Sequence, residues 1–382
     1  MLVSVGFKPH DLSIVEKFRY LNWPLVALIM FIGGIGYAVL YSAGGGSTDP
    51  WAWRHLMRLG VGMVCMLALA LIDVRFWYKQ AYWIYLGALA LLVAVELMGS
   101  LSKGAQRWIN LGVIQLQPSE LMKIALVLAL ARYFHSAYDD EIKRPTYLFV
   151  PLLLIVAPVI LVLKQPDLGT AVTLLATGGV ILFVSGVRLW KFLAAIAAAA
   201  AAAPIIWFQG MHAYQRQRVL TFLDPEADPL GAGYHIIQSK IALGSGGLWG
   251  KGFLQGTQAQ LSFLPEKQTD FAFTMWAEET GFIGAILLLS LFFLVLAISL
   301  LVAYHAISHF ARILAVGIAF NLFLYVMINV SMVIGLIPVV GVPLPLISYG
   351  GTAMLTVLAG FGLLLSVDIH RYTNIARFPV DL

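Results

Sequence analysis

Long stretches of this sequence contain no charged residue, and this feature limits the chain to folds that a membrane can hold. The longest stretch runs from residue 313 to residue 367. About 20 apolar residues cross a bilayer as one helix, so this stretch suffices for two spans, and the sequence PVVGVPLP at 338–345 divides it. Charged residues make up only 11% of the chain, against about 25% in soluble domains. The sequence therefore predicts an all-α integral membrane protein.

The other apolar runs set the number of spans. Eight further segments are each expected to cross the membrane once: 22–43, 59–72, 80–95, 118–134, 145–163, 168–187, 192–211 and 280–304. The prediction is a single polytopic domain over residues 1–382 with about ten transmembrane helices. One large extracytoplasmic loop, 209–270, lies between helices 7 and 8. Residues 1–20 lack the apolar core and cleavage site of a signal peptide, so the first span is expected to be retained.

The positions of Lys and Arg predict the orientation. With the N-terminus in the cytoplasm, thirteen basic residues fall in inner segments and five in short outer loops, and basic residues favour the inner side. Both termini are thus expected in the cytoplasm, with loop 209–270 on the periplasmic side of the cytoplasmic (inner) membrane. This asymmetry explains the net charge of +5, so no nucleic-acid partner is expected. The single cysteine, Cys65, excludes a disulfide within the chain.

Loop 209–270 is expected to be ordered, because structureless loops of this length are uncommon and long loops are often functional. The sequence YHIIQSKIAL at 234–243 predicts an amphipathic helix, with Ile236, Ile237 and Ile241 on its apolar side and Lys240 on the other. The glycines of GSGGLWGKGF at 244–253 let the backbone turn sharply or approach a ligand closely. Outside the loop, the alanine run 194–203 is expected to pack closely against other helices.

Three carboxylates stand where the large loop enters the next helix: Asp270, Glu278 and Glu279. Ionisable groups in a span are costly, so each needs a reason to be there. Asp270 is expected at the water boundary, either as a general base with a raised pKa or as an N-cap, and the residues alone do not decide between these. The deeper Glu278 and Glu279 are expected to pair with a buried cation or a backbone group.

A second pair of charges lies inside a predicted span. Glu120 and Lys123 are three residues apart, which places them on one face of a helix. Two interpretations stay open: an ion pair that holds the bundle together, or one wall of a polar cavity.

Basic residues also gather in the expected outer segments, where they are Lys103, Arg107, Lys164, Arg216 and Arg218. An anionic ligand at the outer surface would explain them, since guanidinium groups suit phosphate oxygens. The alternative is a solvated loop whose cations face the nearby acids Asp224, Glu226 and Asp228. Asp167, three residues after Lys164, favours a helix cap over a catalytic role. No His or Cys pattern typical of a metal site occurs.

The chain resembles the SEDS family (shape, elongation, division and sporulation proteins), and within it the RodA members. The resemblance covers nearly the whole chain and rests on long motifs: SKGAQRWINLG (102–112), QPSELMKIAL (117–126), QPDLGT (165–170), YQRQRVLTFLDPEADPLGAGYHIIQSKIALGSGG (214–247), FLPEKQTDF (263–271) and GLIPVVGVPLPLISYGGTAML (335–355). One position departs from the pattern, because Ala213 stands where an acid begins the YQRQR motif.

The resemblance implies a peptidoglycan glycosyltransferase that polymerises lipid II, the undecaprenyl-linked disaccharide-pentapeptide, into glycan strands during cell elongation and rod-shape maintenance. The essential aspartate of the family falls on Asp270, and its fourth-span pair on Glu120 and Lys123. Arg107 and Arg216, with Lys123, fit family roles near the substrate path. A class B penicillin-binding protein and the elongation machinery are the implied partners.

The expected chemistry is attack of an acceptor hydroxyl, deprotonated by Asp270, on the donor sugar. Lys164, Asp167 and Arg218 are also expected near the substrate. The outer cations would stabilise the negative charge of the leaving diphosphate, and a divalent cation (Mg or Mn) is a further candidate for this role. Two other functions stay open: a flippase that moves lipid II between leaflets, and a scaffold that recruits a penicillin-binding protein.

Overall fold

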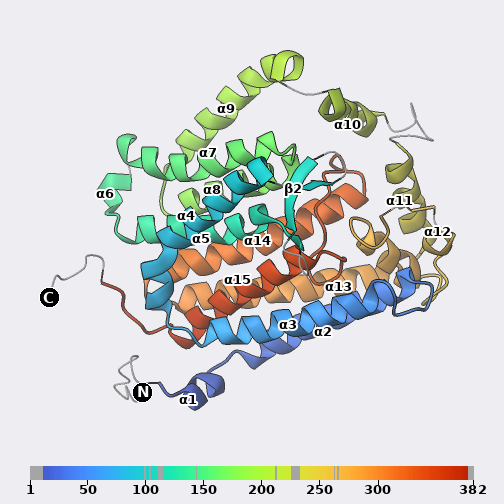
Figure 1. Ribbon diagram of the computed structural model, residues 1–382, viewed down its shortest axis with the longest axis horizontal. Helices are drawn as coiled ribbons and strands as arrows, with labels where there is room; N and C mark the ends of the chain where they lie inside the picture. The colour runs from blue at the N-terminus through green and yellow to red at the C-terminus, as the bar shows by residue number, and fades with distance from the viewer. Residues whose placement is uncertain are drawn as a thin grey trace.

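The computed structural model describes residues 12–376 apart from 99, 103–104, 111–114, 143, 211–212, 225–232, 262 and 265. Its long helices lie side by side as a bundle, with the loop elements at one end (Figure 1). Each of the ten expected spans coincides with one long helix: α2 (Trp23–Ala43), α3 (Ala52–Ala70), α4 (Val74–Met98), α5 (Pro118–His135), α7 (Phe149–Lys164), α8 (Leu168–Val184), α9 (Leu189–Ile205), α13 (Ala272–His305), α14 (His309–Val333) and α15 (Gly351–Ile369).

Shorter elements connect these helices. They are α1 (Ile14–Arg19), α6 (Asp139–Ile142), the 3-10 turn η1 (Thr146–Leu148), the π-helical turn η2 (Ile206–Gly210), α10 (Ala213–Leu223), α11 (Tyr234–Ser245) and α12 (Thr257–Gln260). Three short strands, β1 (Ser100–Ser102), β2 (Ala105–Asn110) and β3 (Gln115–Leu116), form an antiparallel sheet in the order β1-β2-β3. No pattern in the sequence predicted this sheet.

The helices divide into an inner and an outer group. Among the described residues, six helices are long and apolar enough to cross a membrane, and two more, α8 and α9, are apolar but shorter. In the most apolar stretches of α14 and α15, 72% and 78% of the residues are buried, whereas only 28%, 28% and 33% are buried in those of α4, α13 and the α7 segment. An apolar side chain is stable in an exposed position when lipid surrounds it, so the outer helices have the surface expected of a membrane protein.

Helix α5 lies at the centre of the bundle and packs against α4, α7, α8, α14 and α15. It is buried on every side, from Met122 through Leu130 to Phe134. This explains how α5 tolerates the charges that make it a weak span by composition, because neighbouring helices, rather than lipid, surround its polar side chains.

Helix α13 is broken at Gly281, where φ is 70° and ψ is −167°. Beyond the break, the N–H groups of Phe282 and Ile283 donate to the carbonyls of Gly247 and Leu248, at 2.9 and 3.2 Å. The first N–H groups of a helical segment have no partner within it and need one wherever water is excluded. The glycine-rich part of the large loop therefore caps the second half of α13.

The same loop segment also caps the first half of α13. The N–H groups of Lys251 and Gly252 donate to the carbonyls of Glu278 and Glu279, at 3.1 and 3.0 Å. The contact needs glycine, since a β-carbon on Gly250 would lie 2.1 Å from the Glu279 carbonyl oxygen. The glycines of this loop segment therefore let its backbone approach the backbone of α13 closely.

The side chains of Glu278 and Glu279 strengthen this contact. Glu278 is fully buried, and its Oε1 accepts from Lys251 Nζ at 2.7 Å and from the Gln258 N–H at 3.0 Å. Glu279 accepts a hydrogen bond from the Ser42 hydroxyl at the end of α2. Backbone groups also bind both side chains, Gln258 at Glu278 and Leu254 and Gly256 at Glu279, so the expectation of pairing with a buried cation or a backbone group is confirmed through the backbone.

The predicted helix at 234–243 is present as α11, but its buried face differs from the expected one. Ile236, Ser239 and Ala242 are buried, whereas Ile241 is 45% exposed. The Ser239 hydroxyl is accommodated in the interior because it donates to the Val333 carbonyl at 2.8 Å. Residue size and this hydrogen bond, rather than hydrophobicity alone, therefore determine the face that packs against α13 and α14.

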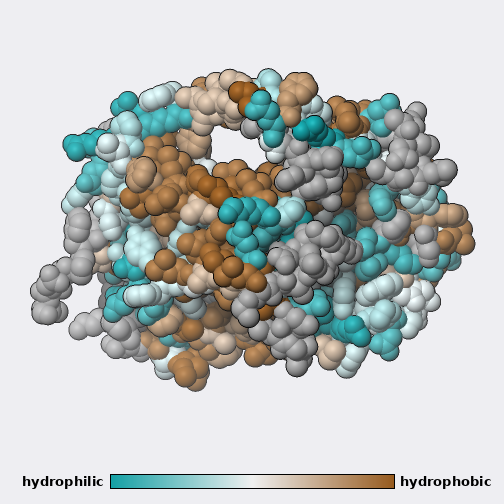
Figure 2. Space-filling view, turned by 45° about the horizontal axis from the view of Figure 1, so that its top comes forward, coloured by the Kyte–Doolittle hydropathy of each residue, from teal (hydrophilic) through white to brown (hydrophobic). Residues whose placement is uncertain are grey.

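Helix α9 stands away from the bundle (Figure 1). None of its residues is buried among those that the structure describes, so the expectation that the alanine run 194–203 packs closely is wrong. Figure 2 shows an opening between the arch that contains α9 and the apolar side chains below it. At its start, Phe192 contacts Phe183 of α8 with ring centroids 6.1 Å apart. Alanine favours a helix even where few partners pack against it, which explains how α9 forms with little tertiary packing.

The break in α13 generates a test. A Gly281→Ala variant should unfold at a lower temperature in detergent, because its φ is unfavourable for alanine and the new β-carbon would lie 2.3 Å from the Gly250 nitrogen. The backbone conformation alone should cost about 1–3 kcal/mol of unfolding free energy. The matched control is Gly179→Ala in α8, where a β-carbon meets no atom within 4 Å. Equal melting temperatures for the two variants would contradict the described docking.

Candidate active site

Asp270 lies just outside α13, at the end of the large loop. Phe271 is the N-cap residue of the helix and makes no side-chain cap, so the alternative in which Asp270 is the N-cap is not the observed one. Asp270 is half-buried. Its position therefore meets the first requirement for a general base, which is access to water and substrate.

Two connections hold the backbone around Asp270. The side-chain amide of Asn329, on α14, donates to the Asp270 carbonyl at 3.0 Å and to the Val342 carbonyl at 2.8 Å. The Tyr349 N–H donates to the Gln268 carbonyl at 2.7 Å. The segment between α14 and α15 is thus fastened to the loop that carries the carboxylate.

Gly341 lies in that segment next to the carboxylate. A β-carbon on Gly341 would lie 3.7 Å from Asp270 Oδ2, and the residue has a φ of +75°. The carboxylate therefore faces a stretch of backbone that contains a glycine turn.

A cavity of about 280 Å³ opens beside Asp270. The loop helices α10 and α11 and the segment between α14 and α15 complete its wall, whose residues are Gln217, Thr221, His235, Ile236, Glu266, Asp270, Phe271 and Val339. The cavity is large enough for part of a sugar, and its lining includes both polar and apolar side chains. A site of this kind can orient a hydroxyl against a carboxylate.

Two titratable groups near Asp270 are shifted by burial. Burial lowers the pKa of His235, although the negative charge of Glu266 opposes this shift. The His235 ring stacks on Phe271, with centroids 6.1 Å apart. Burial also lowers the pKa of Lys267. His235 is therefore neutral at neutral pH, and the carboxylates of Glu266 and Asp270 give this cavity acidic character.

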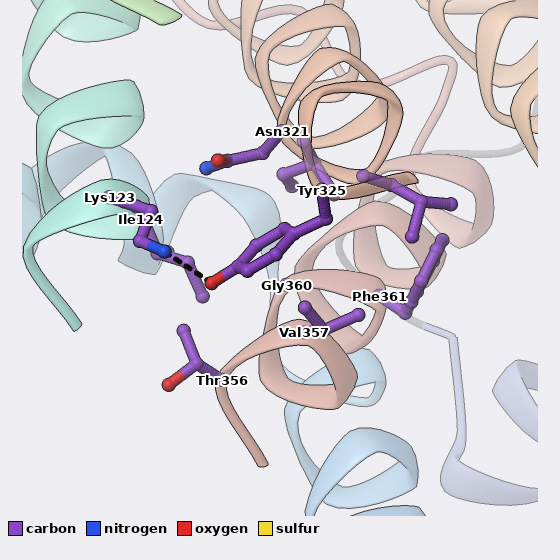
Figure 3. Close-up of a pocket in the computed structure, with 10 residues that line it drawn as sticks. Lys123, Ile124, Asn321, Tyr325, Thr356, Val357, Gly360 and Phe361 are labelled. Carbon is purple, nitrogen blue, oxygen red and sulfur yellow. Dashed lines mark hydrogen bonds between the residues drawn. The ribbon is translucent and has the colours of Figure 1, made fainter. Parts of the chain in front are cut away.

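Glu120 and Lys123 form a pair in the core, where a third residue joins them. Lys123 Nζ lies 2.7 Å from Glu120 Oε1, and the two residues are 2% and 4% exposed. The Tyr325 hydroxyl accepts from Lys123 and donates to Glu120, as Figure 3 shows for the bond to Lys123. The adjoining cavity measures only about 20 Å³, which is room for a water molecule and not for a sugar. In this conformation the group acts as a buried ion pair.

Arg107 and Asp167 meet at the turn between α7 and α8. The Arg107 guanidinium, on β2, donates to the carbonyls of Gln165, at 3.1 Å, and Pro166. Asp167 is the N-cap of α8, and its carboxylate accepts from the Thr170 N–H at 3.2 Å, so the predicted cap is confirmed. Both side chains therefore hold this turn in place.

The remaining cations are dispersed. Lys164 is exposed and lies 3.7 Å from Glu96. Arg216, on α10, donates to the Phe208 carbonyl at 3.1 Å, on the helix that brings Gln217 to the cavity. Lys103 and the side chain of Arg218 lie outside the described residues.

Several residues of the site were not predicted from sequence: His235, Glu266, Tyr325 and Asn329. His235 and Glu266 occur within the family motifs quoted above, and this was the signal in the sequence that could have marked them as site residues. Tyr325 is 202 positions from Lys123, and no spacing rule connects residues at that separation.

Comparisons with known proteins agree on the family. A family model for cell cycle proteins of the FtsW, RodA and SpoVE type matches residues 20–373. The chain is 46% identical over 348 residues to the peptidoglycan glycosyltransferase MrdB of Escherichia coli (strain K12), which covers 91% of this chain and 92% of MrdB. It is 36% identical over 367 residues to stage V sporulation protein E of Bacillus subtilis (strain 168), and this match covers 92% of this chain and 97% of that protein.

Solved structures agree with these relatives. A chain from a peptidoglycan synthase complex, studied for how it coordinates polymerization and crosslinking, matches with a TM-score of 0.80 and 35% identity, covering 92% of this chain and 98% of that one. The rod shape determining protein RodA of Thermus thermophilus matches with a TM-score of 0.70 and 31% identity, and the match covers 92% of this chain and 98% of that one.

A double-mutant cycle tests the buried ion pair of Glu120 and Lys123. Lys123→Met should destabilise the protein by about 3–5 kcal/mol, because it leaves a buried carboxylate without its cation. Adding Glu120→Gln should restore a large part of that loss, which thermal unfolding in detergent would measure. Lys164→Met, at an exposed ion pair, should change little. A double variant whose loss equals the sum of the single losses would contradict the described pair.

Proposed function

This chain belongs to the FtsW, RodA and SpoVE family of cell cycle proteins, and from that premise we propose how it works as a peptidoglycan glycosyltransferase. The enzyme polymerises lipid II into glycan strands for cell elongation and rod shape. The observation that carries the proposed mechanism is the half-buried Asp270 in a cavity of about 280 Å³, at the end of the large loop.

Asp270 acts as the general base. Its carboxylate accepts the proton of the acceptor sugar's hydroxyl, and the oxygen attacks the anomeric carbon of the donor. The bond from that carbon to the diphosphate breaks, and undecaprenyl diphosphate leaves with the electron pair. A carboxylate suits this task when apolar surroundings and nearby negative charge favour its protonated form, and Phe271, Val339 and Glu266 line the same cavity.

The backbone contacts of Asn329 keep the base in position. Because the Asn329 amide binds both the Asp270 and Val342 carbonyls, the base is tied to the segment between α14 and α15, which contributes Val339 to the cavity wall. Positioning of this kind lowers the barrier because the reacting groups need not be ordered during the reaction.

A lipid-linked substrate reaches the cavity from the membrane. The opening below the α9 arch (Figure 2) faces apolar side chains, and α10, which follows this arch along the chain, lines the Asp270 cavity. We place the polyprenyl chain at this opening and the sugars at the cavity. Arg216 and Arg218 on α10 are the candidates for binding the diphosphate, and Lys164 is a further candidate cation. Arg107 and Asp167 hold the turn between α7 and α8, and Glu120 and Lys123 hold the core.

A divalent cation would assist the leaving group. Magnesium binds through one or two carboxylates plus phosphate oxygens and water, and the cavity offers the carboxylates of Glu266 and Asp270. In the described part of the chain, no group of three or more His, Cys, Asp or Glu side chains is arranged so that it could hold a metal ion by itself. Glu266 is therefore the residue that would hold Mg²⁺ or Mn²⁺ together with the substrate, where the cation would stabilise negative charge on the diphosphate.

The enzyme acts in the cytoplasmic membrane with a crosslinking partner. The related synthase complex coordinates polymerization and crosslinking, which supports a class B penicillin-binding protein as the partner of this chain. We propose that both termini lie in the cytoplasm and that the Asp270 cavity opens on the periplasmic side, as the distribution of basic residues indicates.

Asp270→Asn should abolish glycan synthesis from purified lipid II, with a loss of about 10²–10⁴-fold in rate, because the amide cannot accept the proton. Glu141→Gln, at the opposite end of the bundle (Figure 1), is the matched control and should retain the wild-type rate. Wild-type polymerisation by Asp270→Asn would refute the proposed base. Transfer of labelled lipid II between liposome leaflets without glycan synthesis by the wild-type protein would instead identify a flippase.

Asn329→Leu should lower the polymerisation rate by about tenfold, since it removes both donors that position the loop. Leaving two carbonyls unpaired should also lower the melting temperature. The rate is therefore measured well below that temperature, with folding checked by size-exclusion chromatography. A folded variant with an unchanged rate would show that the base does not depend on this connection.

A further inference from the structure

Residues 248–253 expose large apolar side chains at a site that the proposed chemistry does not use. Trp249 is 79% exposed, Leu248 is 64% exposed and Phe253 is 48% exposed. We call these three side chains the interfacial patch. Neighbouring exposed residues of this size mark an interaction surface, because water disfavours them.

The first indication of what covers the patch comes from α13. The Leu248 carbonyl accepts from the Ile283 N–H at 3.2 Å, so the patch begins beside the first turn after the break. The second half of α13, residues 282–305, is about 36 Å long at 1.5 Å per residue, whereas the hydrocarbon core is about 30 Å thick. Phe282 and Ile283 therefore lie near one boundary of the bilayer, and their exposed apolar side chains continue the patch.

The second indication comes from α2, a different helix. Phe253 stacks on Tyr41 with ring centroids 6.4 Å apart and an interplanar angle of 8°. Tyr41 stacks in turn on Tyr37, one turn earlier in α2. Tyr41 lies in the last turn of this span, at the end that faces α12 and the large loop (Figure 1). Tyrosine and tryptophan are enriched where a membrane meets water, so the two helices place the patch at the same depth.

The backbone between the patch residues explains how one short segment faces both lipid and protein. Gly250 and Gly252 have φ values of +81° and +104°. Between them, Lys251 turns inward to the buried Glu278, at 2.7 Å. Trp249 and Phe253, on either side, remain exposed. An ion pair on the protein side and aromatic rings on the other are the arrangement of a segment that lies along a membrane surface.

We propose that residues 248–253 are an interfacial anchor, in which Leu248, Trp249 and Phe253 enter the headgroup–acyl boundary of the outer leaflet. The occupant is lipid, because the patch is continuous with the lipid-facing surface of α13 and level with the aromatic end of α2. The anchor holds the loop that caps α13, and with it the segment leading to Asp270, at a fixed depth.

Fluorescence quenching in lipid nanodiscs tests this proposal. Cys65 is replaced by alanine, and Trp249→Cys is labelled with the fluorophore NBD in nanodiscs of phosphatidylethanolamine and phosphatidylglycerol that contain doxyl-labelled lipid. Label at position 249 should be quenched by the doxyl lipid and at least threefold less by aqueous iodide than label at the control, Gln255→Cys. Gln255 is an exposed polar residue of the same loop, so its label should show the opposite pattern.

Leu248→Cys provides a second position and should behave like Trp249→Cys, which covers the case in which the tryptophan variant does not fold. Iodide quenching at 248 and 249 equal to that at 255, without lipid quenching, would overturn the proposal. Protection from iodide that requires a penicillin-binding protein in the nanodisc would also overturn it, because the patch would then be a protein-docking surface.

Discussion

The arrangement of the end of the bundle that carries the large loop depends on the break in α13 at Gly281. A helix that is interrupted close to a membrane leaves N–H and carbonyl groups that lipid cannot satisfy. Here the glycine-rich loop satisfies them from both sides, through Gly247 and Leu248 toward the second half and through Lys251 and Gly252 toward the first. The loop is consequently part of the helix's own hydrogen-bonding pattern, so its position is determined by the bundle.

This constraint explains how a carboxylate on a loop can be positioned as accurately as one on a helix. Asp270 precedes Phe271, the N-cap of the first half of α13, and the far end of this half is tied to the loop through the pair of buried Glu278 and half-buried Lys251. On its other side, Asn329 ties the Asp270 carbonyl to the segment between α14 and α15. The carboxylate is therefore held from two directions before substrate arrives, and such preorganisation is what a general base requires.

The sequence was sufficient for features that depend on local composition or on short spacings. Apolar runs predicted the ten long helices, the separation of three residues predicted the pair of Glu120 and Lys123, and the residue type of Asp167 predicted a helix cap. These predictions succeed because the physical cause lies within one element. The family motifs, in turn, identified Asp270 as the residue to place at the centre of the site.

Features that depend on contacts between distant segments were beyond the sequence. The partners of Lys123 and Asp270, which are Tyr325 and Asn329, lie on α14 and have no local spacing relation to them. On α11, Ile241 is exposed although it was expected on the apolar side, and Ser239 is buried because a carbonyl on another helix accepts the serine's hydrogen bond. The alanine run of α9 was misjudged for the same reason, since composition permits close packing but does not supply a neighbouring helix.

The central claim is that the Asp270 side chain lies in a cavity open to the outer aqueous phase and occupied by substrate during the reaction. The most direct measurement places a cysteine at position 270 of a protein whose Cys65 is replaced, and follows labelling by a membrane-impermeant thiol reagent in oriented vesicles. The account predicts labelling from the periplasmic side only, slowed by added lipid II. Labelling from the cytoplasmic side, or labelling that lipid II leaves unchanged, would contradict it.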